Sequence, residues 1–538
     1  MIDAAGLRVD LTRQRLPLRA GPALAELLGV TGVERWRDAM FAGEAVNLSE
    51  RRAALHTALR AGAAGCAPSV AQTPSAAQTP SAAQATSAAQ ATSAAQATSA
   101  AQATSAAQVT SAALVKTEVS ATLARMRDVA EAVRSGRWRG ASGRLISDVV
   151  HVGIGGSQLG PQLACEALAG FAHRRVKIHF LGNIDPDAWR RVSIELNPAT
   201  TLFIIASKSW RTPETARNAQ AVRHWLVEGG IAESQLHLHL LGVSSNREAA
   251  RAFGIADEHL FTCPDWVGGR YSLWGAIGLP VMISIGADRF DALLAGARAM
   301  DVHYQSAPPL ANAPMMLALA SAWNARLLPR ATEVVIPYSD RLRRLPAHLQ
   351  QLQMESNGKS VLADGSATTR YAAMPAIWGE PGTESQHSFF QALHQGPVEH
   401  ALEFILVERE PGTPDPWQRD RALLANALAQ AQAFSMGHTD RSIERCHPGN
   451  RPVTLIHLPQ LDPATLGALI ALYEHKTVSL GWLWGINPFD QWGVEQGKKL
   501  AEGYEALLDP ARPWPAAQSL ELDAASALSL ARLRSIAG

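Results

Sequence analysis

Short apolar segments rich in β-branched residues alternate with segments of helical periodicity from about Val119 onward. These apolar segments form two series, and each segment is typical of a buried strand: Val149–Ile154, Val176–Leu181, Thr201–Ala206 and Leu236–Val243, then Glu333–Pro337, Glu403–Val407 and Val453–Leu458. Buried strands separated by helices predict parallel sheets with right-handed crossovers. Because helical sequence near 290–330 separates the series, we predict an α/β protein with two αβα sandwich domains.

Two regions precede this pattern and differ from it. The first 60 residues show helical spacing with capping residues, so we predict a helical N-terminal segment. A tandem hexapeptide repeat over 71–112 follows, in a stretch that lacks charge between Arg60 and Lys116. Its Ala, Ser, Thr and Gln bury little apolar surface, which predicts a solvated or loosely helical insert without chemistry. The predicted divisions are 1–66, 67–115, 116–290, 291–510 and a helical C-terminal arm at 511–538.

Charge and composition exclude several functional classes. The chain has 49 Lys and Arg against 48 Asp and Glu, a net charge of +1, which argues against electrostatic binding of nucleic acid. It contains no apolar run long enough to span a membrane and no secretory signal at its start. Its four cysteines are widely spaced, which predicts reduced thiols in a cytoplasmic protein: Cys66, Cys165, Cys263 and Cys446. Only seven of the basic residues are Lys, so a Lys within a motif can indicate ammonium chemistry.

A glycine turn follows the first predicted strand. The motif GIGGSQLGP places Gly153, Gly155, Gly156 and Ser157 just before a predicted helix. Gln158 stands where a dinucleotide-binding motif needs glycine, so that cofactor class is excluded. The backbone N–H groups and the Ser157 hydroxyl remain suited to an anion at a helix N-terminus. A plain strand–helix turn is the alternative.

A second polar loop follows the strand Thr201–Ala206. Its sequence SKSWRTPET ends in a Thr-Pro pair that is typical of a helix start. Hydroxyls, an ammonium group and helix N–H groups together suit a phosphate monoester; the residues are Ser207, Lys208, Ser209 and Thr212. No nucleotide P-loop pattern is present, and simple helix capping is the alternative.

Two charged residues are candidates for chemistry on a bound sugar. Glu355 follows a helical stripe of leucines and precedes an Asn-Gly stop signal, which places it in the last turn of a predicted helix. An anion is disfavoured at that end of a helix dipole, which suits a general base near neutral pH. A frayed surface Glu is the alternative. Arg270, after a Gly-Gly turn, would either stabilise developing negative charge or pack at the surface.

Histidine and the C-terminal motif add further candidates. His387 and His394 are seven residues apart and would share a helix face, but no H-E-x-x-H pattern accompanies them, so we predict no metal site. His237 and His239 fall on a predicted strand as a polar face. In QWGVEQGK the residues at the two ends, Gln491 and Lys498, would also share a helix face, with a solvent-facing Lys as the alternative.

These motifs together resemble the phosphoglucose isomerase family. In order they are NLSERRAALHTALR, GIGGSQLGP, SKSWRTPET, DWVGGRYSLWGAIGL, QMESNGKS, WGEPGTESQH and INPFDQWGVEQGK. The resemblance implies two sugar-isomerase-type domains, no metal or organic cofactor, and a homodimer whose active sites share residues. It also implies interconversion of glucose 6-phosphate and fructose 6-phosphate in glycolysis and gluconeogenesis.

By motif position, the resemblance implies a role for each candidate. Glu355 would move a proton between C2 and C1 through a cis-enediol, and Arg270 would stabilise the enediolate. His387 and Lys498 would assist ring opening, with His387 supplied by the partner subunit. The substrate would be held by Gly156, Ser157, Ser207, Lys208, Ser209, Thr212, Gln351 and Gln491. The family's phosphate loop usually reads SKTFTTQET, so the added charge of Arg211 bears on affinity more than on chemistry.

Competing classes fit the sequence less well. A non-catalytic phosphosugar-binding regulator would use the same phosphate cradle but would not need Glu355, His387 and Lys498 together. A glutamine-dependent amidotransferase would need Cys directly after the first Met, where this chain has Ile2. A nicotinamide-dependent dehydrogenase is excluded by Gln158.

Overall fold

The computed structural model describes residues 1–14, 16, 21–62, 113–328, 330, 332–368, 374–409, 417–509 and 522–537. The hexapeptide repeat and Cys66 lie outside these residues, so the prediction for the insert stays a prediction. The chain forms two units, Met1–Pro488 and Phe489–Gly538, and each is described by itself. The domain boundaries given by the sequence likewise stay a prediction.

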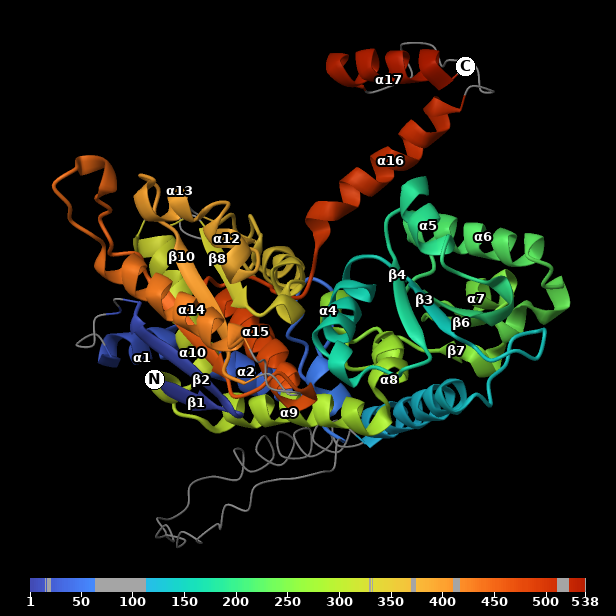
Figure 1. Ribbon diagram of the computed structural model, residues 1–538, viewed down its shortest axis with the longest axis horizontal. Helices are drawn as coiled ribbons and strands as arrows, with labels where there is room; N and C mark the ends of the chain where they lie inside the picture. The colour runs from blue at the N-terminus through green and yellow to red at the C-terminus, as the bar shows by residue number, and fades with distance from the viewer. Residues whose placement is uncertain are drawn as a thin grey trace, which may run out of the picture. The chain divides into compact units, whose positions relative to one another are not determined.

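The first sheet has five parallel strands in the order β4-β3-β5-β6-β7. They are β3 (Asp148–Val152), β4 (Lys177–Leu181), β5 (Thr201–Ala206), β6 (Leu240–Val243) and β7 (Leu260–Phe261). Helices α5 (Pro186–Ser193), α6 (Pro213–Glu228) and α7 (Arg247–Phe253) pack on one face. Figure 1 shows α4 (Leu159–Ala167) and α8 (Leu279–Ile285) across the sheet from them. Helices on both faces explain why β3 and β5 are buried along their whole length.

The second sheet has six strands in the order β1-β2-β11-β10-β8-β9. Its parallel strands are β8 (Thr332–Tyr338), β9 (Ala376–Trp378), β10 (Ala401–Val407) and β11 (Val453–Leu458). On one face lie α13 (Phe390–Gln395) and α14 (Arg419–Met436), packed through Phe390, Phe404 and Phe434. The long helix α15 (Pro463–Leu483) is buried nearly all round, beside α9 (Ala287–Ser306) and α10 (Ala313–Ala322).

The prediction of two α/β sandwiches with parallel sheets is confirmed, but the start of the chain differs from it. Strands β1 (Ile2–Ala4) and β2 (Leu7–Arg13) form an antiparallel hairpin that joins the second sheet. Leu7 and Val9 point inward while Arg8 is exposed, a period of two that the helical prediction missed. Helices α1 (Gly21–Val30) and α2 (Val33–Ala42) follow the hairpin.

The predicted strand Leu236–Val243 is wrong in its first half. Residues Glu233–Leu238 form a 3-10 helix, and the strand begins only at Leu240. His239 donates from one ring nitrogen to the Thr201 carbonyl and accepts from the Ala141 N–H with the other, so it is a packed core residue. Burial lowers its pKa, and the neutral ring is the form that can make both contacts.

The C-terminal unit contains α16 (Glu495–Leu508) and α17 (Ala524–Ala537). None of the helices in the described ranges is long and apolar enough to cross a membrane. Cys165, Cys263 and Cys446, the cysteines within those ranges, are free thiols.

Candidate active site

The glycine turn after β3 lies directly against the loop that carries Arg270. Residues Gly155–Ser157 form a short 3-10 helix leading into α4. A Cβ on Gly156 would lie 2.2 Å from the carbonyl carbon of Gly269, so only glycine allows this approach. Nε2 of His151 donates to the Ser157 carbonyl at 2.6 Å, and burial lowers the pKa of His151 to about 4. A neutral histidine therefore holds the turn from behind.

The hydroxyl-rich loop lies beside the glycine turn, as expected for adjacent parallel strands. A Cβ on Gly153 would lie 3.1 Å from the carbonyl of Ala206, the residue at the end of β5. Ser207 is buried, and its hydroxyl donates to the Thr212 hydroxyl at 3.4 Å. Thr212 precedes α6 without a side-chain capping bond, and Ser209 is exposed. The structure therefore places three hydroxyl groups in the loop that leads into the first turn of α6.

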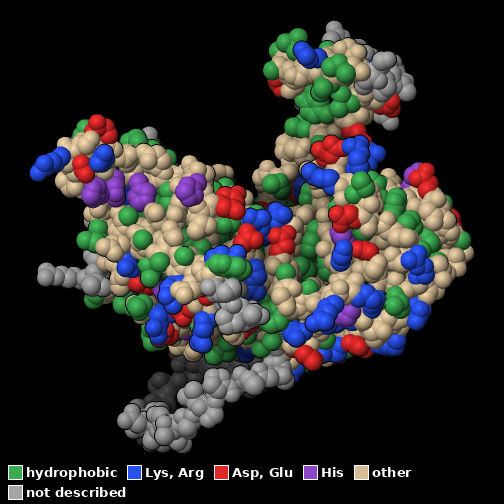
Figure 2. All heavy atoms as spheres, viewed as in Figure 1, with side chains coloured by type: hydrophobic (Ala, Val, Ile, Leu, Met, Phe, Trp, Pro, Cys, Tyr) green, Lys and Arg blue, Asp and Glu red, His purple; other side chains and the backbone are tan. Residues whose placement is uncertain are grey.

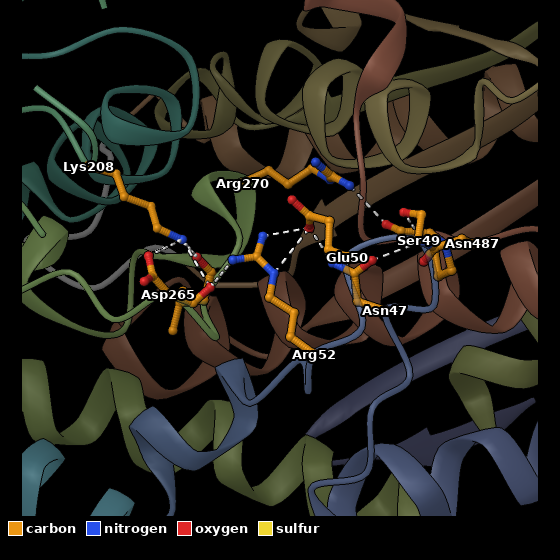
Figure 3. Close-up of polar contacts among 10 residues, drawn as sticks. Asn47, Ser49, Glu50, Arg52, Lys208, Asp265, Arg270 and Asn487 are labelled. Atoms are coloured by element: carbon orange, nitrogen blue, oxygen red, sulfur yellow. Dashed lines mark hydrogen bonds and ion pairs between the residues drawn. The ribbon is translucent and has the colours of Figure 1, made fainter. Parts of the chain in front are cut away.

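Lys208 connects this loop to the segment before Arg270. Its ammonium donates to the backbone carbonyls of Asp265 and Val267, each at 3.0 Å (Figure 3). Burial lowers the pKa of Lys208. The two carbonyl contacts use two of its three N–H donors. Lys208 therefore holds the segment before Arg270 in place and also contributes a positive charge.

Arg270 and Glu355 form the charged centre of the site. Arg270 lies in a 3-10 helix (Gly269–Tyr271), and its Nη1 is 3.6 Å from Oε2 of Glu355. Nε donates to the Ser356 hydroxyl at 2.7 Å and Nη2 to the Pro488 carbonyl at 2.9 Å. The Arg270 side chain is 2% exposed and that of Glu355 is 22% exposed. A fixed, buried cation thus stands beside a carboxylate that solvent or a ligand can reach.

The sequence predicted Glu355 in the last turn of an ordinary helix, but the structure places it in a π-helix. Helix α11 (Leu345–Leu349) passes into a π-helix at Gln350–Glu355, and such widened turns are frequent at functional sites. The buried leucine stripe and the stop near Gly358 agree with the prediction. Arg270 also lies next to Glu355, a positive neighbour that the prediction did not include.

Gln351 completes the group of residues that the structure brings together. A Cβ on Gly155 would lie 3.0 Å from Nε2 of Gln351, so the amide faces the glycine turn. These contacts therefore connect the glycine turn, the Arg270 loop and the π-helix. The arrangement combines an anion-binding edge, a cation and a carboxylate.

Comparison with known proteins identifies the family. Residues 10–80 and 88–514 match the family model described as phosphoglucose isomerase. The chain belongs to the phosphoglucose isomerase family. This confirms the resemblance seen in the sequence and the isomerase class that it implied.

Individual phosphoglucose isomerase relatives match over nearly the whole chain. A glucose-6-phosphate isomerase of Burkholderia pseudomallei is 42% identical over 549 residues, covering 100% of this chain and 92% of the relative. Glucose-6-phosphate isomerase 2 of Chromobacterium violaceum is 42% identical over 517 residues, covering 93% and 86%. The crystal structure of a glucose-6-phosphate isomerase from Chlamydia trachomatis superposes with a TM-score of 0.81 at 29% identity, covering 99% of this chain and 92% of that one.

Three predicted site residues of this phosphoglucose isomerase family member lie outside the segments that form the charged centre. His387 is exposed after α12 (Gly382–Gln386), and within the described ranges no hydrogen bond joins its ring to Arg270 or Glu355. Gln491 and Lys498 belong to the C-terminal unit. Gln491 has φ −153° and precedes a 3-10 helix (Trp492–Val494), so the prediction that it shares a helix face with Lys498 is wrong. Lys498 donates to Glu495 at 2.8 Å.

Several histidines gather along one edge of the second sheet's domain (Figure 2). The ring centroids of His394 and His447 are 5.0 Å apart, and those of His438 and His447 are 5.9 Å apart. His394 stacks on Phe434 at 3.7 Å, which is a packing role. Within the ranges that the structure describes, no three His, Cys, Asp or Glu side chains are arranged to hold a metal ion.

The sequence reasoning missed the residues that hold Arg270. The Ser356 hydroxyl accepts from Arg270 and lies 3.0 Å from the Tyr271 hydroxyl, whose pKa is raised by burial. Ser356 directly follows Glu355 in the motif QMESNGKS, and this position could have marked it as a residue of the site. The Pro488 carbonyl lies in the motif INPFDQWGVEQGK, but a backbone carbonyl has no side-chain signal in the sequence.

Proposed function

We propose that this chain interconverts glucose 6-phosphate and fructose 6-phosphate by proton transfer through a cis-enediol. The observation that supports this most directly is the buried Arg270 guanidinium 3.6 Å from the Glu355 carboxylate. The carboxylate takes the proton from C2 and returns it to C1, and the cation offsets negative charge that develops on the substrate oxygens. Because a proton and an electron pair move within one molecule, the reaction needs no redox carrier.

The phosphate is held at the edge of the first sheet, and this fixes the position of the reacting carbons. In this proposal the phosphate contacts are Gly156, Ser157, Ser207, Lys208, Ser209 and Thr212, and the further substrate contacts are Gln351 and Gln491. The close approach of Gly155 to Gln351 supports a substrate bound between the glycine turn and the π-helix.

Ring opening is assigned to His387 and Lys498 in the same proposal. The exposure of His387 supports the idea that it acts in the site of a partner subunit, which makes the protein a homodimer with shared active sites. The free thiols support a cytoplasmic location, where the reaction serves glycolysis and gluconeogenesis.

A coupled assay of the purified protein with fructose 6-phosphate tests the activity. We expect turnover that a chelator does not change, and in heavy water we expect deuterium to enter the product at the carbon that receives the proton. Absence of turnover contradicts the proposed function. Chelator-sensitive turnover would instead favour a metal-dependent site built from histidines, and product without deuterium would contradict the enediol route.

Substituting Ser209 with Ala tests the phosphate loop. We expect KM for fructose 6-phosphate to rise about tenfold or more while kcat falls by less than about threefold, because a hydrogen bond to a charged group is lost in both the ground and transition states. Steady-state kinetics measure both constants. Ser193→Ala, at the partly exposed C-terminal end of α5, is the matched control and should change neither. A fall in kcat with unchanged KM contradicts the anchoring role.

A further inference from the structure

A short N-terminal segment reaches both sides of the charged centre. Residues 47–52, which we call the strap, close on themselves through backbone hydrogen bonds of 3.0 and 3.2 Å between Asn47 and Arg52. Within the strap, Glu50 accepts from the Asn47 amide and from Arg52, at 2.6 Å from its Nη2. The strap is therefore a small, internally bonded unit whose Arg52 charge is balanced by Glu50.

One side of the strap holds the segment that binds Arg270. The Asn487 amide donates to Oδ1 of Asn47 at 2.9 Å and to the Ser49 hydroxyl at 3.0 Å. The next residue is Pro488, whose carbonyl accepts from Nη2 of Arg270 at 2.9 Å. Asn47 and Asn487 are 2% and 7% exposed, so water competes little for these contacts.

The other side of the strap holds the loop that leads into Arg270. Arg52 donates to the Asp265 carbonyl, the same oxygen that accepts from Lys208 at 3.0 Å. Beyond the strap, the Leu55 N–H donates to the Trp266 carbonyl at 3.1 Å. Figure 3 shows the side chains of the strap, together with Asp265, in one row between Lys208 and Asn487.

We propose that the strap is a positioning element for Arg270, with Asn47 as its principal residue; this rests on the proposed function. Nη1 of Arg270 lies 3.6 Å from Oε2 of Glu355, which is longer than a hydrogen bond. The position of the guanidinium therefore depends on its other partners. These partners include the Ser356 hydroxyl, the Tyr271 ring and the Pro488 carbonyl. The strap holds Asn487, the residue next to Pro488. A shift of the guanidinium would weaken stabilisation of the enediolate more than substrate binding.

The test is a double-mutant cycle of Asn47→Ala with Arg270→Ala, measured by steady-state kinetics with fructose 6-phosphate. We expect Asn47→Ala alone to lower kcat about tenfold and to change KM by less than about threefold, as for a misplaced group at a reacting centre. In the Arg270→Ala background it should lower kcat by less than about twofold. Asn426→Ala, at an exposed position on α14, is the matched control and should leave both constants unchanged.

An equal fall in kcat with and without Arg270, or a change in KM alone, overturns the positioning role. Ser49→Ala gives a second measurement if the buried Asn47→Ala variant does not fold, because Ser49 is exposed. Its expected loss in kcat is about threefold, again absent without Arg270. If the unmodified protein does not turn over fructose 6-phosphate, the proposed function fails; if it does and neither variant affects kcat, only the role of the strap fails.

Discussion

Replacing Glu355 with Gln should lower kcat by at least ~10²-fold in both directions of the isomerisation, the lower range for loss of a general base. The amide has the shape of the carboxyl group and keeps an oxygen toward Arg270, but it cannot accept the proton from C2. KM should change by less than about threefold, because the phosphate-holding loops are untouched. Coupled assays starting from glucose 6-phosphate and from fructose 6-phosphate measure these constants.

The control for this prediction is another Glu whose charge is removed far from the site. Glu228, exposed at the end of α6 and paired with His224 at 3.1 Å, is suitable, and Glu228→Gln should keep normal kcat. Near-normal turnover by Glu355→Gln would remove Glu355 from the mechanism. A loss of kcat that is accompanied by a lower melting temperature in Glu355→Gln alone would point to a structural effect instead.

The parallel strands were predictable because each is marked by a run of buried β-branched residues. β5 matches its predicted range, and β11 does so as well. Strands β7 and β9 were missed because two or three residues carry no periodicity. The β1–β2 hairpin was missed because its stability comes from pairing with β11, some 440 residues away, which no local pattern reveals.

The sequence predicted site residues whose own side chains suit the chemistry of a motif. It did not predict residues that only hold those side chains in place. Arg270 and Glu355 were chosen from separate segments, and the structure brings them to 3.6 Å. The leucine spacing before Glu355 fits an ordinary helix and does not mark the widened helical turn there. Two contacts were not predictable because they join distant segments: Asn47 with Asn487, and Arg270 with the Pro488 carbonyl. The second acceptor is also a backbone group, which the pattern of side chains does not reveal.

The scarcity of Lys in the chain has a structural counterpart in α15. Lys476 is fully buried, and its ammonium donates to Glu333 on β8 and, at 2.6 Å, to Glu403 on β10. Ser321 and Tyr473 donate to the second oxygens of the two carboxyl groups at 3.0 and 2.9 Å. A compact ammonium group reaches both carboxyl groups where the larger, planar guanidinium of Arg would not pack equally well.

The two carboxyl groups divide one negative charge unequally. Burial and then the charge of Glu333 raise the pKa of Glu403 to about 8. Burial by itself would raise the pKa of Glu333, but the charge of Lys476 and the hydrogen bonds with Glu403, Lys476 and Ser321 together lower it. Near neutral pH the cluster is therefore one ammonium, one carboxylate and one neutral carboxyl group, a balanced set that joins α15 to the second sheet.

Replacing Lys476 with Met should destabilise the protein by about 3–4 kcal/mol at pH 7, because the buried Glu333 must then take up a proton. Protonating a carboxyl group costs about 1.4 kcal/mol for each pH unit by which the solution lies above the pKa of that group in the unfolded chain. A carboxyl group whose folded pKa is raised favours the folded state at low pH and loses that contribution as pH rises toward the folded pKa. The penalty should therefore shrink to about 1 kcal/mol at pH 5. Urea unfolding of both proteins at pH 5, 6 and 7 measures the difference in free energy of unfolding.

Two further variants separate charge balance from packing. Lys177→Met, at the exposed start of β4, removes the same ammonium from the surface and should leave the unfolding midpoint unchanged at each pH. Adding Glu333→Gln to Lys476→Met removes the carboxyl group that would otherwise have to take up a proton. The double variant should regain more than half of the lost stability, and its remaining deficit should not grow between pH 5 and pH 7. If the penalty of Lys476→Met were instead the same at pH 5 and pH 7, the loss would come from packing around α15, because only an uncompensated carboxyl group makes the cost grow with pH.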